Sequence, residues 1–109
     1  TCDEIGRVLA NLINIVPAGL IVFLPSYSYE AHLVRRWRRT GLLERLKKRK
    51  RVHREPKNAR DVESALDAYS RDATTTSKTG GALLLCVIGG KMSEGINFAD
   101  DMARCVLVV

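Results

Sequence analysis

Apolar residues follow two patterns along this chain, one with helical spacing and one continuous. The helical pattern predicts helices over residues 3–16, 27–39, 42–49 and 59–71. The continuous pattern predicts strands over residues 20–24, 82–88 and 104–109. The first of these strands lies between a glycine and a proline, and its unbroken apolar run is typical of a strand buried on both faces. Helices that alternate with strands imply right-handed crossovers, so the predicted fold class is α/β with a parallel three-layer sheet.

Local signals fix several boundaries of these elements. Asp3 is expected to be the N-cap of the first helix, and Ser26 the N-cap of the second, which should end near Gly41. Residues 50–54 are compatible with a short polar strand, and 73–81 form a polar, glycine-ended loop. One face of the fourth helix carries Val62, Ala65, Leu66 and Tyr69.

The length of 109 residues suits one small domain, and 46% hydrophobic residues are enough for a core. Both ends interrupt a predicted element, so we expect a piece of a larger protein. No apolar run reaches the ~18–20 residues that span a bilayer, and no signal peptide is expected. The three cysteines have no metal-ligand spacing; Cys86 and Cys105 lie in apolar runs and are expected to be buried in a reducing, intracellular compartment.

Positive charge is concentrated in one block. Between Arg35 and Arg54 there are eleven Lys or Arg and one acid, Glu44, which leaves a net −4 for the rest of a chain of net charge +6. Such a block is typical of polyanion binding, most often of nucleic acid. The alternative is a solvated helix face followed by a basic turn.

The loop at residues 89–98 follows an apolar strand and is the strongest candidate site. It is not a Walker A loop, because Leu85 stands where that motif needs its first glycine. Lys91 and Ser93 can contact a phosphate, and Gly95 lets a ligand approach the backbone. Glu94 can accept a hydrogen bond, and Asn97 can contact a ribose hydroxyl. The alternative is an ordinary strand-to-helix turn.

A second candidate follows the first predicted strand. The Ser26 hydroxyl can cap the next helix, whose N-terminus attracts phosphate, and Tyr27 can stack on a base. Local sequence alone favours a plain cap with packed tyrosines. His32 and His53 lack metal-ligand partners and are expected at the surface, while Trp37 is expected to anchor its helix to the core.

Two stretches resemble motifs of a known family, the superfamily 2 DNA helicases that carry an iron–sulphur cluster (DEAD_2/DEAH-like). Residues 16–27, VPAGLIVFLPSY, resemble motif IV, and residues 84–98, LLCVIGGKMSEGINF, resemble motif V. The Gly89-Gly90 start and Asn97 are most similar to the chromosome-loss (sister-chromatid cohesion) branch. The spacer with Arg54-Glu55-Pro56-Lys57 and Tyr69 is also similar, so the resemblance covers nearly the whole chain. Ala103 departs from the glycine that the family commonly has before the next arginine.

The resemblance implies that residues 1–109 are the N-terminal part of the second of two RecA-like motor domains. Motif IV would lie near 17–29, a basic spacer at 35–57 and motif V at 84–98. Carried over by motif, Ser26, Tyr27, Lys91 and Ser93 would contact nucleic acid. The residues that would face the nucleotide and couple its state to DNA grip are Glu94, Gly95 and Asn97.

The resemblance further implies an ATP-dependent DNA helicase, nuclear, translocating 5′ to 3′ on single-stranded or forked DNA in repair or chromosome cohesion. ATP and Mg²⁺ would be shared with the first motor domain, and the 4Fe-4S cluster would lie elsewhere in the protein. Cohesion or replication-fork proteins are the expected partners, and this piece alone should not hydrolyse ATP. Two rivals remain open: a basic nucleic-acid-binding module without a motor, and a structural fragment of a metabolic enzyme.

Overall fold

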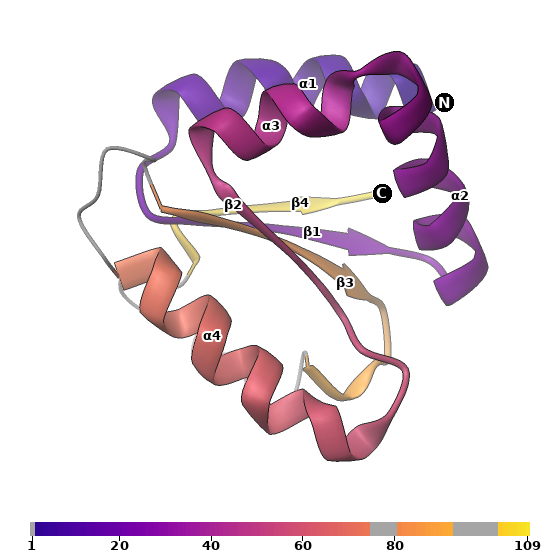
Figure 1. The fold of residues 1–109 in the computed structure, drawn as a ribbon, viewed down its shortest axis with the longest axis vertical. Coiled ribbons are helices and arrows are strands. Elements are labelled where there is room, and N and C mark those ends of the chain that lie inside the picture. Colours follow the sequence, from indigo (N-terminus) through magenta and orange to yellow (C-terminus); the bar gives the residue numbers. More distant parts are fainter. Residues whose placement is uncertain (1, 75–80, 93–102) are drawn as a thin grey trace.

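The computed structural model describes residues 2–74, 81–92 and 103–109, which build a parallel sheet covered on both faces by helices (Figure 1). Within this part the strand order is β2-β3-β1-β4 and every neighbouring pair is parallel. The strands are β1 (Gly19–Leu24), β2 (Arg51–Arg54), β3 (Ala82–Val87) and β4 (Cys105–Val108). The helices are α1 (Cys2–Ile15), α2 (Tyr27–Thr40), α3 (Leu42–Arg49), the 3₁₀ turn η1 (Ala59–Asp61) and α4 (Val62–Thr74). The predicted α/β fold class is confirmed.

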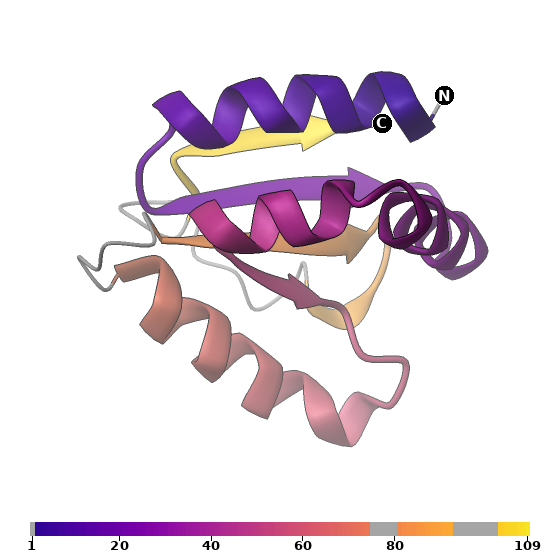
Figure 2. The ribbon, with the colours of Figure 1, turned by 45° about the horizontal axis from the view of Figure 1, so that its top comes forward.

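Figure 2 shows the three layers: α1, α2 and α3 lie on one face of the sheet and α4 on the other. Successive residues of a strand point to opposite faces, so each central strand contributes side chains to the core under both helical layers. Leu20, Val22 and Leu24 pack under the three-helix layer, whereas Ile21 packs with Tyr69 of α4. The two central strands are therefore apolar at every position, as predicted from the continuous runs.

The three-helix layer is anchored by Trp37, which is fully buried, as predicted. α2 begins where expected, because the Ser26 side chain accepts a hydrogen bond from the Tyr29 backbone N–H at 3.1 Å. It ends at Gly41, whose φ of 82° is the left-handed conformation of a helix C-cap. None of the helices in the described residues is both long and apolar enough to span a membrane.

One local prediction at a helix end was wrong. Asp3 is not an N-cap: α1 already includes it, and its carboxylate instead accepts two hydrogen bonds from Arg36, each 3.2 Å. The predicted short polar strand is confirmed as β2, but it begins at Arg51, and Lys50 before it is fully buried. Its ammonium donates to the Ala18 carbonyl oxygen at 2.9 Å, and burial lowers the pKa of this amine.

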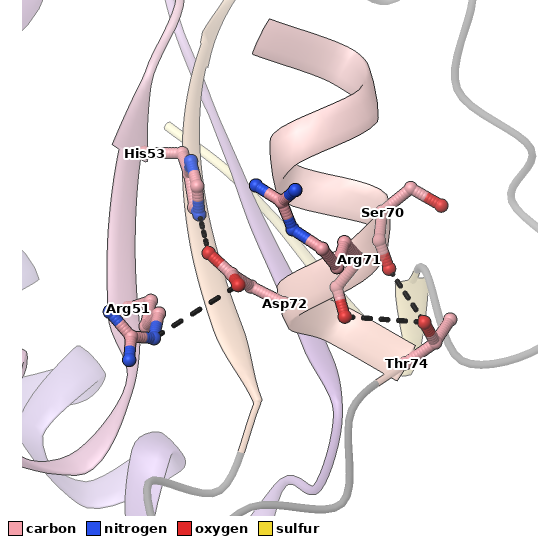
Figure 3. A network of polar contacts seen from close by, with 6 residues as sticks. All are labelled: Arg51, His53, Ser70, Arg71, Asp72 and Thr74. Carbon is pink, nitrogen blue, oxygen red and sulfur yellow. Dashed lines mark hydrogen bonds and ion pairs between the residues drawn. The ribbon is translucent and has the colours of Figure 1, made fainter.

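His53 was expected at the surface, and this also was wrong. The His53 side chain leaves β2 towards α4, so its ring is only partly exposed and lies edge-on to Tyr69, whereas the neighbouring Val52 packs on the three-helix layer. The His53 Nε2 is 2.7 Å from Asp72 Oδ2, and Arg51 approaches the other oxygen of that carboxylate at 4.0 Å (Figure 3). These contacts join the edge strand β2 to α4. His32 is exposed, as predicted.

The centre of the sheet makes one prediction about thiol chemistry. Burial, with a smaller contribution from the charge of Glu55, raises the pKa of the Cys86 thiol from its ordinary 9.0 to about 12. Because the thiolate is the nucleophile, we expect iodoacetamide at pH 8 to modify Cys86 at least about a hundredfold more slowly than the half-buried Cys105. Peptide mapping by mass spectrometry measures both rates. Equal rates in the native protein would contradict this burial, and equal rates in denaturant are the control.

Candidate functional site

The candidate site lies where three parallel strands end at the same edge of the sheet. β1 ends at Leu24, β2 at Arg54 and β3 at Val87, so the residues that follow them are brought together. Segments that are far apart in sequence, at 25–27, 55–57 and 88–91, thus share one edge. In an open parallel sheet this edge is where ligands bind.

Ser26 and Tyr27 begin α2 at this edge, as the sequence suggested. The Ser26 oxygen accepts the helix-cap hydrogen bond, yet the residue is exposed, so its hydroxyl can still donate to a ligand. Tyr27 is half-buried and lines a cleft at this edge, so its predicted stacking on a base stays a prediction. Its phenol donates a hydrogen bond to Glu55 Oε2 at 2.7 Å, which fixes the ring beside the end of β2.

Glu55 is the residue that joins the three segments. It is only 5% exposed, and its Oε1 accepts a hydrogen bond from the Val87 backbone N–H at 3.2 Å. Its own backbone N–H donates to the Leu85 carbonyl at 3.0 Å and so continues the ladder between β2 and β3. A carboxylate this deeply buried is tolerated because both oxygens have donors.

The same hydrogen bond affects the phenol. Donation to the Glu55 carboxylate, followed by burial and by the charge of Glu55, raises the pKa of Tyr27 above its usual value of 10.0. The Tyr27 hydroxyl therefore stays protonated through the physiological range. It can act as a fixed donor and not as a base.

Gly90 packs directly on this carboxylate. A Cβ atom at Gly90 would meet Glu55 Oε2, and the Gly90 N–H donates to the Val87 carbonyl at 2.9 Å to close a turn. Position 90 therefore requires glycine, because the Glu55 carboxylate lies too close for any side chain. The sequence analysis predicted a glycine needed for close approach in this loop, but it named Gly95. The turn sets the direction in which the chain leaves β3 towards the predicted phosphate-binding residues.

A cleft of about 270 Å³ opens beside this junction. Tyr27, Lys57, Gly89, Gly90 and Lys91 are among its lining residues, and both lysines are exposed. The cleft therefore combines two cations from separate segments with the backbone of a glycine turn. This arrangement suits an anionic group such as a phosphate.

A second tie holds the start of α2 to the end of β2. Arg54 donates to both oxygens of Glu30, at 2.7 and 3.3 Å, and Glu30 is only 3% exposed. Glu30 is three residues after Tyr27, so both side chains leave the helix on the same face. The first turn of α2 is therefore attached to residues 54 and 55 at two points.

The structure places only some of the predicted site residues. Ser26, Tyr27 and Lys91 lie at one edge, as the motif assignment implied. Ser93, Glu94, Gly95 and Asn97 lie outside the described residues, so their roles stay predictions. Sequence reasoning placed Glu55 and Lys57 in a spacer similar to the family but gave neither residue a role in the site. The available signal was an acid placed directly after a polar strand, beside a segment with family similarity.

Potential metal ligands do not cluster in the described residues. No group of three or more potential ligands among His, Cys, Asp and Glu gathers in the described part of the chain. Cys86 lies in the middle of the fully buried strand β3, and no such group forms around it in the described residues.

The junction predicts a strongly non-additive pair of substitutions. Gly90→Ala should lower the free energy of unfolding by about 2 kcal/mol, because the new methyl group displaces the Glu55 carboxylate. In a Glu55→Ala background the clash is absent, so the same change should cost less than about 0.5 kcal/mol beyond the cost of Glu55→Ala itself. Urea unfolding of the four proteins measures the coupling. Additive costs would show that Gly90 does not pack on Glu55.

Two sequence comparisons relate the chain to known proteins. A family model described as "Helicase C-terminal domain" matches residues 9–109. The chain is 50% identical over 98% of its length to "ATP-dependent DNA helicase DDX11" of Danio rerio and 52% identical over 98% to the Mus musculus protein of that name. It is 42% identical over 97% of its length to "ATP-dependent DNA helicase CHL1" of Debaryomyces hansenii. The chain spans only 12 or 13% of the length of these relatives.

Proposed function

Because this chain belongs to the helicase C-terminal domain family, we propose that it is the first part of the second motor domain of an ATP-dependent DNA helicase. In this proposal the sheet edge described above contacts the phosphate backbone of single-stranded DNA through Ser26 and Lys91. Tyr27 and Glu55 position these contacts, and Lys57 adds a further cation. Sequence-independent backbone contact is the mode that a translocating enzyme needs.

The observation that carries the proposal is the Tyr27–Glu55–Val87 junction. It links the segment that resembles motif IV to the segment that resembles motif V through one buried carboxylate. A shift of the loop that starts at Gly90 would therefore move the Glu55 carboxylate and, through it, the Tyr27 side chain. Such a mechanical link is what coupling between nucleotide state and DNA grip requires.

The loop residues beyond Met92 complete the proposal. Ser93 is assigned to DNA, and Glu94, Gly95 and Asn97 are assigned to the nucleotide, following the motif resemblance. ATP with Mg²⁺ would bind between this domain and the first motor domain, and the cluster would belong to another part of the protein. We further propose 5′ to 3′ movement on single-stranded or forked DNA, duplex unwinding in repair or sister-chromatid cohesion, cohesion or replication-fork partners, and a nuclear location.

The test is the response of DNA affinity to nucleotide in the whole protein. The wild type should bind a single-stranded oligonucleotide with affinities that differ between the empty, ADP-bound and ATP-analogue-bound states. Tyr27→Phe removes one hydrogen bond to a charged acceptor, a change of about 1.5–3 kcal/mol at most. We expect it to reduce the difference between nucleotide states roughly tenfold while the oligonucleotide still binds, as fluorescence anisotropy would measure.

Tyr29→Phe is the matched control. It removes a hydroxyl from the same turn of α2, and in the described residues the Tyr27 hydroxyl, not that of Tyr29, reaches Glu55. This control should keep the wild-type response. A wild-type protein whose DNA affinity ignores the nucleotide, but which loses binding on charge reversal between Arg35 and Arg54, would support the basic module without a motor and overturn the proposal.

A further inference from the structure

A basic groove runs between α1 and α3, away from the sheet edge described above. The two helices lie side by side in the three-helix layer (Figure 1). Two adjoining hollows, of about 640 and 240 Å³, form the groove and share Ala10 and Arg45 in their linings. None of the residues that line it also lines the cleft at Tyr27 and Lys91.

Cations dominate the lining of this groove. They are Arg7, Arg36, Arg45, Lys48 and Arg49. The one acid in the lining, Asp3, is already engaged by two hydrogen bonds from Arg36, which lower the pKa of its carboxyl. In the part of the chain that the structure describes, no carboxylate pairs with Arg45, Lys48 or Arg49. Asn11, Asn14 and Thr40 add neutral polar groups.

The cations lie in a row along α3. Arg45, Lys48 and Arg49 are spaced i, i+3 and i+4, so their side chains share one face of the helix and repel one another. Glu44, the one acid of α3, forms its ion pair with Lys47, at 3.6 Å, and neither residue lines the groove. The positive charge of α3 is thus paired with an acid outside the groove, whereas the three cations of α3 inside the groove have no carboxylate partner in the described residues. A face needed only for solubility would not require this separation.

We propose that this groove binds a second segment of nucleic-acid phosphate backbone, separate from the strand at the sheet edge. α3 is about 12 Å long, so its row of cations can contact more than one phosphate of the same strand. The apolar groups in the floor, Leu46 above all, are buried or half-buried. The groove therefore lacks the deep apolar pocket that anchors a protein partner. That the segment is DNA rests on the proposed function.

The experiment measures how DNA affinity depends on salt in the nucleotide-free whole protein. Arg45→Ala combined with Lys48→Ala removes two exposed cations without altering the core. The slope of log affinity against log salt should become shallower by about 0.9 per lost contact on duplex, or about 0.7 on a single strand, so by about 1.8 or 1.4. Binding at low salt should weaken roughly tenfold. The substrate that shows the change, a blunt duplex or a single-stranded oligonucleotide, identifies the segment bound.

Arg38→Ala combined with Lys47→Ala is the matched control, because it removes the same charge from α2 and α3 outside the groove. It should leave the slope unchanged. Unchanged slopes in the groove variant on both substrates, or equal changes in the control, would overturn the proposal. Binding of polyglutamate that only the groove variant loses, with unchanged DNA slopes, would assign the groove to an acidic protein and also overturn it.

The two proposals fail separately. Loss of nucleotide coupling in the wild type would refute the motor while leaving the groove and its salt slope intact. Normal coupling together with an unaltered slope in the groove variant would refute only the groove.

Discussion

The buried carboxylate of Glu55 is the constraint around which the functional edge is organised. A carboxylate at 5% exposure is costly unless its oxygens have donors, and here the donors are the Tyr27 phenol and the Val87 backbone. These donors come from the ends of two other chain segments, so satisfying one charge fixes three segments at once. Gly90 is then left no room for a side chain. The geometry of the edge follows from the electrostatic need of one side chain.

The rest of the fold places that carboxylate. The register of β1 and β3 pairs Leu24 with Val87, and that of β2 and β3 pairs Arg54 with Leu85, so the strands end close together. This register is held by fully apolar central strands, which can slip only by exposing core residues. The Arg54–Glu30 pair then attaches the first turn of α2 to the same corner. Packing thus sets the position, and polar contacts set the orientation.

Periodicity and family motifs were enough to predict the α/β class, nearly every element and the edge that carries Ser26, Tyr27 and Lys91. They could not predict which polar residues are buried. Glu55 finds its partners 28 and 32 residues away, and His53 finds Asp72 19 residues away. Such pairings depend on which segments the fold brings close together, and a local pattern of polar residues carries no information about that. Asp3 shows the converse, because a good local cap signal was overridden by Arg36 on another helix.

The basic block shows most clearly that charges counted together in the sequence need not lie on one surface of the structure. In the sequence, residues 35–54 are one polyanion-binding candidate; in the structure they separate into several roles. Lys50 is buried and donates to the Ala18 carbonyl oxygen, and Arg54 donates to the Glu30 carboxylate at the functional edge. Arg45, Lys48 and Arg49 remain as a row beside α1. Neighbours in sequence thus serve the core, the junction and an open groove, because a helix and a strand distribute successive side chains to different faces. Substitutions within the block should therefore be interpreted residue by residue, by the surface that each side chain reaches.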